Sequence, residues 1–357
     1  MSSPLFQPVR IGDLHLPNRI LMAPLTRLRA TPDGTPTPII ADYYAQRASA
    51  GLIISEMTIV SPMGQAYINA PGLYTDSHRQ GWRTVTSAVH QEGGRIFAQI
   101  GHAGRISHPS LLPNNATPVA PSAIRPAGHV HTHSGNQPYV TPHALDTNEI
   151  PAVIEEFAAA ARMAQEAGFD GIELHAANGY LIDQFLRDGT NQRTDEYGGS
   201  PQNRVRFLLE VIEAVSKIWG PSRVGVRLSP FNPFNDMSDS NPRDAFAVFA
   251  AALAPLGLAY IHVIEPATET NRLTPRLRQL FQGPVIGNGG FHAGAAGQAI
   301  HNGEAEAIAF GVPFLANPDL PARLAANLPL NTPDPSTFYS GGARGYTDYP
   351  AYAHTAL

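Results

Sequence analysis

Residues 169–180 read Phe-Asp-Gly-Ile-Glu-Leu-His-Ala-Ala-Asn-Gly-Tyr and say most about the architecture of the chain. The run that starts at Phe169 is typical of a buried strand. Before it, residues 149–167 carry apolar side chains along one helical face, and Gly168 is placed to end that helix. A helix that leads directly into a buried strand is the repeating unit of an α/β fold with a parallel sheet.

The same unit recurs from one end of the chain to the other. Short apolar runs alternate with helix-length periodic segments, another of them over residues 202–219, and the composition does not change between repeats. Eight repeats predict a single α/β domain over residues 1–357, a (β/α)₈ TIM barrel. The expected strands cover residues 20–24, 52–57, 95–100, 170–175, 223–229, 259–264, 284–286 and 307–311.

The composition favours a soluble enzyme. The chain has 357 residues, 43% of them hydrophobic and 15% charged, with a net charge of −5 and no basic run, so neither nucleic acid nor a membrane surface is expected as a partner. Cysteine is absent, which excludes disulfides, thiolate nucleophiles and cysteine metal sites. The sequence shows no signal-peptide pattern and no run of bilayer-spanning length, so a cytoplasmic location is expected.

Two segments do not follow the repeat. Residues 107–146 are rich in Pro, His, Asn and Ser and have no helical period. An irregular segment of this length in a compact domain is usually functional, so we expect an excursion with a short hairpin on the catalytic face of the barrel. Residues 330–357 are polar and rich in Pro and Gly. We expect this tail to pack back onto the barrel, with a loose end as the alternative.

Polar side chains mark the C-terminal ends of the strands, where the reacting groups of a parallel barrel collect. His175, Asn178 and Tyr180 lie at the end of one strand and just beyond it. An imidazole and an amide can both donate hydrogen bonds to a developing oxyanion, and a phenol can deliver a proton. A satisfied loop network is the alternative interpretation of these three residues.

Two other strands present a polar residue on one face. Gln99 alternates with Ile100 in the third strand, and Arg227 alternates with apolar neighbours in the fifth. A buried guanidinium is costly unless acceptors meet it, so Arg227 indicates a ligand contact. Thr26 follows Pro24, which ends the first strand, and offers a hydroxyl at the barrel mouth. A simple turn threonine is the alternative there.

Glycines end the last two expected strands, at residues 287–290 and at Gly311, and a helical segment is expected after each, beginning near Ala293 and near Asn317. Glycines in this place let backbone N–H groups approach an anion, and many barrels hold a phosphate after strands seven and eight. A phosphate-bearing cofactor across the mouth, with Gln99 and Arg227 at its other end, would explain these strand ends together.

Longer motifs surround these residues and extend over nearly the whole chain. They are PLF at 4–6, LPNRI at 16–20, APLTR at 23–27, GHAGR at 101–105, HAANGYLIDQF at 175–185, DEYGGS at 195–200, NR at 203–204, FLANPDL at 314–320 and GYTDYP at 345–350. Together they resemble the Old Yellow Enzyme family of FMN-dependent ene-reductases, and in particular its N-ethylmaleimide reductase-like members. Thr26 stands where another branch of that family has cysteine, which places the chain in the branch without it.

The resemblance implies a non-covalently bound FMN at the barrel mouth. Thr26 would contact the flavin near O4, and Gln99 and Arg227 would hold its pyrimidine edge. The charge of Arg227 would stabilise the reduced, anionic flavin. Backbone at the remaining strand ends would cradle the ring system and the phosphate, and the residues concerned are Pro24, Leu25, Gly289, Gly290, Gly311 and Val312.

The resemblance also implies the reaction. NADPH or NADH would reduce FMN, and N5 would pass a hydride to the β-carbon of an activated alkene such as an α,β-unsaturated carbonyl, a nitro-olefin or a maleimide. His175 and Asn178 would bind the carbonyl or nitro oxygen, and Tyr180 would protonate the α-carbon. Tyr67 and Tyr346 match positions that line the substrate cavity. Family relatives are monomers or homodimers, so either state is expected.

Three positions depart from the family pattern. Val312 stands where many relatives carry a phosphate-binding arginine, and the loss of one such hydrogen bond predicts FMN binding weaker by about 1.5–3 kcal/mol unless other donors compensate. Gly101 stands in place of a bulky aromatic residue and predicts a roomier cavity. Arg344 stands in place of an acidic residue and adds positive charge near the mouth.

Two other functions and one other site are alternatives to this interpretation. A metal-assisted hydrolase or aldolase with His175 as a ligand would need further His and carboxylate ligands at other strand ends, which the sequence lacks. His129, His131 and His133 alternate as metal ligands can, but their Pro- and Gly-rich surroundings favour a solvated loop, so no metal site is expected. A flavin-binding sensor that has lost turnover is the remaining alternative, prompted by Val312.

Overall fold

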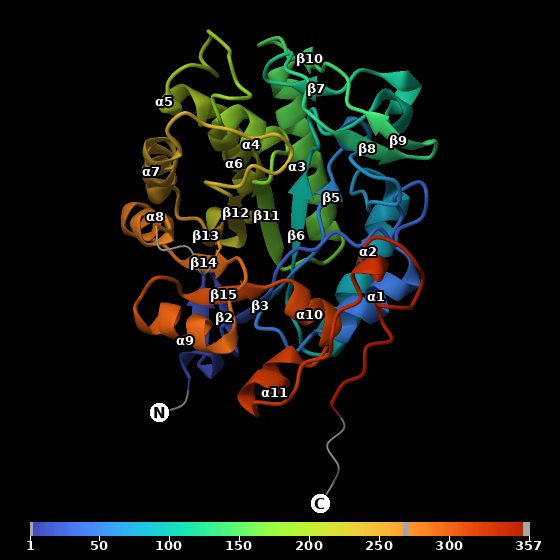
Figure 1. The fold of residues 1–357 in the computed structure, drawn as a ribbon, viewed down its shortest axis with the longest axis vertical. Helices are drawn as coiled ribbons and strands as arrows, with labels where there is room; N and C mark the ends of the chain where they lie inside the picture. The colour runs from blue at the N-terminus through green and yellow to red at the C-terminus, as the bar shows by residue number, and fades with distance from the viewer. Residues whose placement is uncertain (1–2, 267–270, 353–357) are drawn as a thin grey trace, which may run out of the picture.

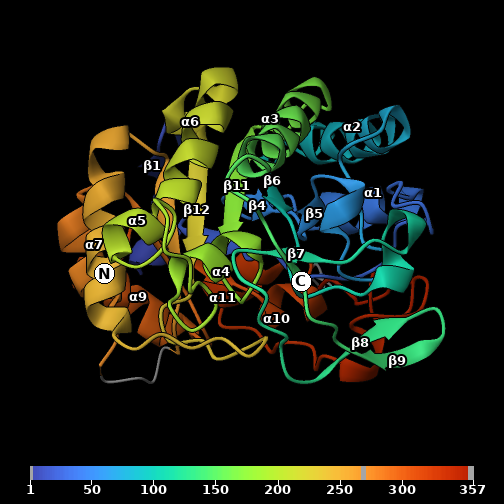
Figure 2. The same ribbon diagram turned by 90° about the horizontal axis from the view of Figure 1, so that it is seen from above.

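The structure, a computed structural model, describes residues 3–266 and 271–352. Within these ranges, eight parallel strands pair in a closed ring in the order β3, β4, β6, β11, β12, β13, β14 and β15, and β15 pairs back onto β3. Helices cover the outside of the strands (Figure 1), and Figure 2 shows α2, α3, α6 and α7 arranged around them. The closed ring confirms the predicted (β/α)₈ barrel.

The strands of the ring are short. They are β3 (Ile20–Met22), β4 (Ile53–Ile54), β6 (Ile96–Gly101), β11 (Gly171–Ala176), β12 (Val224–Leu228), β13 (Tyr260–Ile264), β14 (Val285–Asn288) and β15 (Ala307–Phe310). The second predicted strand, over residues 52–57, is wrong in its extent, because pairing with β6 is interrupted after β4 and resumes in β5 (Thr58–Ile59). Before the ring, β1 (Val9–Ile11) and β2 (Leu14–Leu16) form an antiparallel hairpin.

Eleven α-helices lie in the described ranges. They are α1 (Pro38–Ala45), α2 (Asp76–Gln91), α3 (Ile150–Glu166), α4 (Leu181–Leu186), α5 (Pro201–Arg204), α6 (Arg206–Trp219), α7 (Pro242–Leu253), α8 (Thr274–Phe281), α9 (Ala293–His301), α10 (Val312–Ala316) and α11 (Leu320–Ala325). Two predicted helices have wrong bounds. The helix expected over residues 202–219 is divided at Val205 into α5 and α6. The helix expected from near Asn317 is α11, which begins at Leu320, and the short helix α10 before it was not expected, although Pro313 suits the first turn of a helix.

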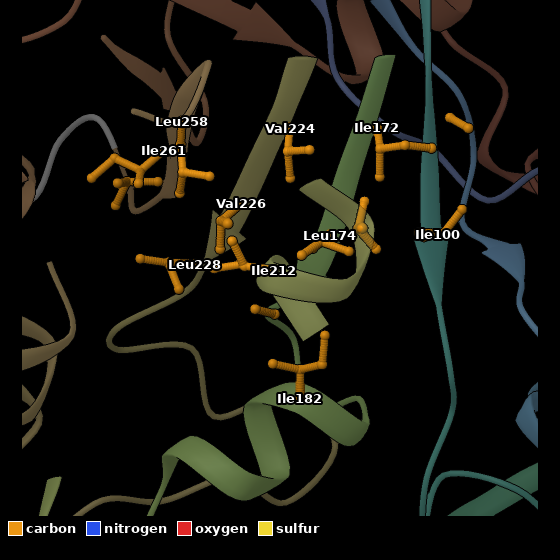
Figure 3. Close-up of a cluster of buried hydrophobic side chains, with 14 of the residues drawn as sticks. Ile100, Ile172, Leu174, Ile182, Ile212, Val224, Val226, Leu228, Leu258 and Ile261 are labelled. Carbon is orange, nitrogen blue, oxygen red and sulfur yellow. The ribbon is translucent and has the colours of Figure 1, made fainter. Parts of the chain in front are cut away.

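The outward face of the strands builds the main hydrophobic core. Ile172 and Leu174 of β11 lie beside Val224 and Val226 of β12, and Figure 3 shows them together with Ile212 of α6. Successive side chains of a strand point to opposite faces, so the residues between these positions face the barrel interior.

The barrel interior has an apolar layer and a polar layer. The apolar layer contains Phe97, Tyr260 and Ile286, and residues of the β1–β2 hairpin pack against it and close the N-terminal end of the barrel. The polar layer consists of buried residues nearer the C-terminal ends of the strands, namely Gln99, Glu173, His175, Arg227, His262 and Asn288. This second layer positions the candidate site.

The segment 107–146 forms a small irregular structure. It contains the 3₁₀ turns η3 (Pro109–Leu111) and η4 (Pro113–Asn115), the parallel pair β7 (Val119–Ala120) and β10 (His143–Ala144), and the antiparallel hairpin of β8 (His129–Thr132) and β9 (Gly135–Pro138). Val130 and Tyr139 share a hydrophobic cluster with Tyr180. The segment therefore lies over the end of the barrel that carries the predicted catalytic residues. His131 Nδ1 is 3.1 Å from Asn136 Oδ1, a local contact within the hairpin.

The described part of the tail lies along α1 and the loop that follows β3, where it is coloured red in Figure 1. Arg27 Nη2 donates to the carbonyl of Gly345 at 2.7 Å, and Arg29 Nη2 donates to that of Thr337 at 2.7 Å. The ring of Tyr346 stacks on that of Tyr43, with centroids 4.0 Å apart. Buried arginines thus fix the tail by its backbone carbonyls.

Candidate active site at the barrel mouth

His175 lies on the inward face near the end of β11 and is 4% exposed. Its register partner on β12 is Arg227. Burial, together with the positive charge of Arg227, holds the pKa of His175 well below its usual value, so the imidazole is neutral at pH 7. Its Nδ1 has no hydrogen-bond partner among the described residues. A buried ring nitrogen without a partner is suited to a ligand.

Asn178 follows β11 with a left-handed backbone (φ 57°) that neighbouring residues hold in place. Its N–H donates to Ser229 Oγ at 2.8 Å, and Asn235 Nδ2 donates to its carbonyl at 2.8 Å. Asn232 Nδ2 donates to the side-chain Oδ1 of Asn178, also at 2.8 Å. Because Oδ1 is engaged, Nδ2 is left to donate. The loop after β12 therefore holds Asn178 with its Nδ2 free to donate. Sequence analysis missed Asn232 and Asn235, because no local pattern marks them.

Tyr180 completes the group at this strand end. Its ring meets that of His175 edge-on, with centroids 4.8 Å apart, and its hydroxyl lies 2.9 Å from that of Tyr67. Burial and the neighbouring Tyr67 phenol raise the pKa of Tyr180 well above its usual value. The phenol therefore stays protonated at neutral pH. The structure thus brings Tyr180 into contact with both His175 and Tyr67.

The tail places Tyr339 at this site in place of Tyr346. Tyr346 was expected to line the cavity, but it is fully buried and stacked on Tyr43, so it belongs to the core. Tyr339 is exposed and close enough to contribute to the raised pKa of Tyr67, which burial chiefly causes. Sequence analysis missed Tyr339, because only the route of the tail brings it to the barrel mouth.

Gln99 and Arg227 both lie inside the barrel, in agreement with the alternation of their strands, and are 1% and 5% exposed. Arg227 Nη2 donates to Asn288 Oδ1 at 3.0 Å, whereas its buried Nε has no partner in the described part of the chain. Gln99 Nε2 donates to Glu173 Oε1 at 2.7 Å. Sequence analysis missed Glu173 and Asn288 as interior residues, although their positions on the inward faces of their strands could have indicated them.

The other side of the mouth is formed by the ends of β3 and β15. The N–H of Ala23 donates to the carbonyl of Phe310 at 3.0 Å, which holds the two strand ends together. Pro24 is buried there, and Leu25 and Thr26 are partly exposed. Thr26 therefore presents its side chain near the barrel mouth, where a ligand can reach it.

The glycine-rich strand ends leave backbone open to a ligand. Gly289 has φ 125°, and a Cβ there would lie 1.9 Å from the carbonyl oxygen of Glu265, so only glycine fits. At Gly311 a Cβ would lie 3.4 Å from Leu25 Cδ2. Gly290 and Val312 are exposed at these ends. Backbone N–H groups placed in this way are suited to a phosphate.

A pocket of about 740 Å³ lies at the C-terminal ends of β12, β13 and β14. Asn232, the residue that orients Asn178, lies in its wall, and so does Gly289. Phe231 and Arg243 form another part of the wall, with the guanidinium 5.2 Å from the ring centroid. Cavities of this size with a few convergent polar groups are typical of cofactor and small-molecule sites.

The model of the NADH:flavin oxidoreductase / NADH oxidase family matches residues 4–331. The chain belongs to this family, the Old Yellow Enzyme family. The match confirms the predicted resemblance, and it makes the protein a flavin oxidoreductase of an FMN-dependent family that includes alkene reductases. The residues present fit FMN, because the buried Nε of Arg227 has no partner in the described part of the chain and the strand end at Gly289 has no room for a Cβ beside the carbonyl of Glu265.

Curated relatives share the whole length of the chain. A "probable flavin mononucleotide-dependent alkene reductase" of Leishmania infantum is 44% identical over 356 residues, which cover 97% of both chains. The "12-oxophytodienoate reductase 2" of Arabidopsis thaliana is 42% identical over 366 residues, which cover 99% of this chain and 97% of the relative. Similarity of this extent covers every strand of the barrel.

Solved structures agree with this assignment. Morphinone reductase in complex with tetrahydroNAD has a TM-score of 0.95 and 48% identity, with 99% of each chain covered. The Old Yellow Enzyme homologue from Zymomonas mobilis has a TM-score of 0.94 and 45% identity, with 97% of this chain and 99% of the homologue covered. In the described part of this chain, no helix is long and apolar enough to span a membrane, and no group of three or more His, Asp or Glu residues could hold a metal ion.

Proposed function

We propose that the protein is an NAD(P)H-dependent ene-reductase that reduces α,β-unsaturated carbonyls, nitro-olefins or maleimides. One observation carries this proposal: at the mouth of the barrel the neutral His175 ring meets the protonated phenol of Tyr180, and Asn178, whose Oδ1 is engaged, keeps its Nδ2 free to donate. The neutral imidazole and the amide can hold an oxygen that gains negative charge, and the phenol can supply the proton that the reaction consumes.

The cofactor-binding residues lie on both sides of the mouth. Arg227 offers an unpartnered Nε and Gln99 a free carbonyl oxygen toward a ligand inside the barrel. When bound, FMN supplies the hydride chemistry that links the nicotinamide donor to the alkene. The remaining contacts are assigned to strand ends and the backbone near them, at Pro24, Leu25, Thr26, Gly289, Gly290, Gly311 and Val312.

The substrate-binding residues gather around Tyr180. His175 Nδ1 and Asn178 Nδ2 would donate to the carbonyl or nitro oxygen, which fixes the alkene against the cofactor face. Tyr180 would then protonate the α-carbon, and its raised pKa keeps the proton available at neutral pH. Tyr67 shares a hydrogen bond with Tyr180 and would line the cavity with Tyr339.

Two relatives support the choice of substrate and donor. The Leishmania protein is named an alkene reductase, and morphinone reductase was solved with tetrahydroNAD, an analogue of a nicotinamide donor. Either NADPH or NADH serves as the donor in this proposal, and the enzyme acts in the cytoplasm as a monomer or homodimer.

A two-step spectroscopic experiment tests the function. The purified protein is expected to bind FMN and turn yellow, to lose its colour anaerobically with NADPH or NADH, and to regain it when 2-cyclohexenone is added. A protein that stays colourless in excess FMN would contradict the cofactor. A protein that loses its colour but never regains it with enones, nitro-olefins or maleimides would contradict the ene-reductase activity and favour a flavin-binding sensor.

A further inference from the structure

A buried carboxylate lies at the centre of the polar layer inside the barrel. Glu173 of β11 is fully buried and accepts hydrogen bonds from three side chains on two other strands. Gln99 Nε2 donates to Oε1 at 2.7 Å, Tyr260 Oη donates to Oε2 at 3.1 Å, and His262 Nδ1 lies 2.8 Å from Oε2. Neither Glu173 nor His262 takes part in the proposed chemistry, so their role needs a separate explanation.

Glu173 is ionised. Burial by itself would raise the pKa of Glu173, but the hydrogen bonds from His262 and Gln99 and the positive charge of Arg227 outweigh it, and the pKa is lowered. Burial lowers the pKa of His262, so its imidazole is neutral at pH 7 and donates its Nδ1–H to the carboxylate. The interior of the barrel therefore contains the anionic Glu173 together with the cationic Arg227.

The carboxylate fixes the orientation of Gln99. An ionised carboxylate only accepts hydrogen bonds, so the amide must turn its NH₂ group toward Glu173. The carbonyl oxygen of Gln99 then points away from Glu173, and no described residue donates to it. Gln99 is thus prepared as an acceptor for an N–H group of a ligand. The pyrimidine edge of a flavin carries such a group.

Glu173 also balances the charge of Arg227. The two side chains form no direct ion pair in the described structure, and Arg227 instead donates to Asn288. The negative charge of Glu173 acts on Arg227 through the low-dielectric interior, where charges interact strongly. The positive charge of Arg227 would stabilise the negative charge that a flavin gains on reduction. The negative charge of Glu173 would offset part of this stabilisation.

We propose that Glu173 is a positioning residue that orients Gln99 for the cofactor and lowers the reduction potential set by Arg227. This inference rests on the proposed FMN-dependent function. The proposal gives the Glu173 side chain two separate effects on the cofactor site. The reach of the carboxylate decides the orientation of Gln99, and its charge decides the electrostatic balance with Arg227.

Two substitutions at Glu173 separate these contributions. Glu173→Gln keeps the size but removes the charge, so the midpoint potential of bound FMN is expected to shift to a more positive value. Glu173→Asp keeps the charge but shortens the side chain, so the potential is expected to stay near that of the wild type while the Kd for oxidised FMN rises about tenfold, the effect of one lost hydrogen bond. FMN titration by fluorescence and a redox titration of the bound flavin measure the two quantities.

The test of orientation uses Gln99→Met as a background. With the amide removed, Glu173→Asp is expected to leave the Kd for FMN unchanged, because there is no longer a side chain to orient. An additional tenfold loss in that background would overturn the positioning role. An unchanged potential in Glu173→Gln would overturn the electrostatic role. Should Glu173→Gln not fold, Glu173→Asp carries the test, and an unchanged Kd for FMN in that variant overturns the proposal.

A carboxylate outside the barrel interior provides the matched control. Glu156 on α3 accepts from Ser61 Oγ at 2.7 Å, and Glu156→Gln is expected to change neither the Kd nor the potential. A potential shift as large as that of Glu173→Gln would show a nonspecific charge effect and overturn the proposal. A wild-type protein that does not bind FMN would contradict the proposed function, whereas normal FMN binding with no effect at Glu173 contradicts this inference alone.

Discussion

The environment of Tyr180 decides whether its hydroxyl is a useful acid. Burial and the Tyr67 phenol raise its pKa, so the proton is held at neutral pH and released only to a strong base such as a developing carbanion. We expect Tyr180→Phe to slow alkene reduction by about 10²-fold, the lower range for general acid catalysis. Reduction of FMN by NADPH should stay near the wild-type rate. Stopped-flow measurement of both half-reactions checks this, and equal losses in the two would contradict the assignment.

His175 and Asn178 are expected to act as a pair of oxygen-binding donors. Phenolate ligands place a similar oxygen at such donors, so His175→Ala combined with Asn178→Ala should weaken phenol binding by about 10–100-fold, the effect of two lost hydrogen bonds. Spectral titration with a substituted phenol measures the affinity. The double variant should still bind FMN, because neither residue is assigned to the cofactor. Phenol affinity at the wild-type level would place the oxygen site elsewhere.

At the scale of single elements, His102 in the segment after β6 makes the free energy of unfolding depend on pH. Burial lowers the pKa of His102 to about 3, and its Nδ1 accepts from the N–H of Gly104 at 3.0 Å. The unfolded chain binds a proton at this residue below about pH 6.5, whereas the folded chain does so only near pH 3. Its contribution to stability is therefore complete above about pH 6.5 and is lost as the pH falls, by about 1.4 kcal/mol per pH unit.

His102→Asn removes this titration and keeps an acceptor for Gly104. The free energy of unfolding of the variant, measured in urea between pH 4 and pH 6, should fall less steeply with acidification than that of the wild type, by about 1.4 kcal/mol per pH unit. Parallel curves for His102→Asn and the wild type would show that His102 is not a neutral buried group.

The loop after β12 depends on Arg105, which lies just beyond β6. Arg105 Nη2 donates to the carbonyl of Asp236 at 2.8 Å, and Nη1 donates to that of Ile124 at 3.1 Å. This loop holds Asn178, so its position decides how the donor is aimed. A lysine cannot reproduce the planar fork of arginine. Arg105→Lys should lower the free energy of unfolding by about 1.5–3 kcal/mol and raise KM for enones more than it lowers kcat.

Arg125 is exposed and lies in the segment 107–146, next to Ile124. Arg125→Lys is therefore the control for Arg105→Lys. Steady-state kinetics and urea unfolding should show Arg125→Lys close to the wild type. If both variants behave alike, Arg105 does not position the loop.

At the scale of the whole molecule, Arg47 joins segments that are far apart in the chain. It is fully buried on the C-terminal side of α1, and its guanidinium donates to the carbonyls of Phe314, Leu315 and Tyr346 at 2.9, 2.8 and 3.3 Å. Arg47→Met leaves these buried carbonyls without a donor. We expect the free energy of unfolding to fall by about 3 kcal/mol or more. Faster hydrogen exchange in the tail should accompany this loss.

Arg95 is half-exposed and serves as the control, because Arg95→Met should cost less than about 1 kcal/mol. Urea unfolding and hydrogen exchange followed by mass spectrometry measure both variants. A tail that exchanges at the wild-type rate in Arg47→Met would show that other contacts are sufficient to hold it.

Much of the barrel could be predicted because its signals are local. Alternation within β6 and β12 indicated the inward positions of Gln99 and Arg227, and Gly168, with φ 85°, ends the helix before β11 as predicted. The predicted bounds were wrong where contacts with distant strands, and not the local sequence, decide where an element begins or ends. The extent of the second strand was wrong because the partner β6 decides where pairing stops. The short helix α10 was not expected, because the segment 312–316 is too short to show a helical period.

The sequence by itself determined the repeating unit and the inward positions of Gln99 and Arg227, because these depend on the chemistry and period of neighbouring residues. Only the tertiary structure decided which distant residues join them. The stacking of Tyr346 on Tyr43 excludes it from the cavity and leaves Tyr339 there, and the contacts of Glu173 cross three strands. Such contacts depend on how segments far apart in the chain pack together, and no local period encodes that packing.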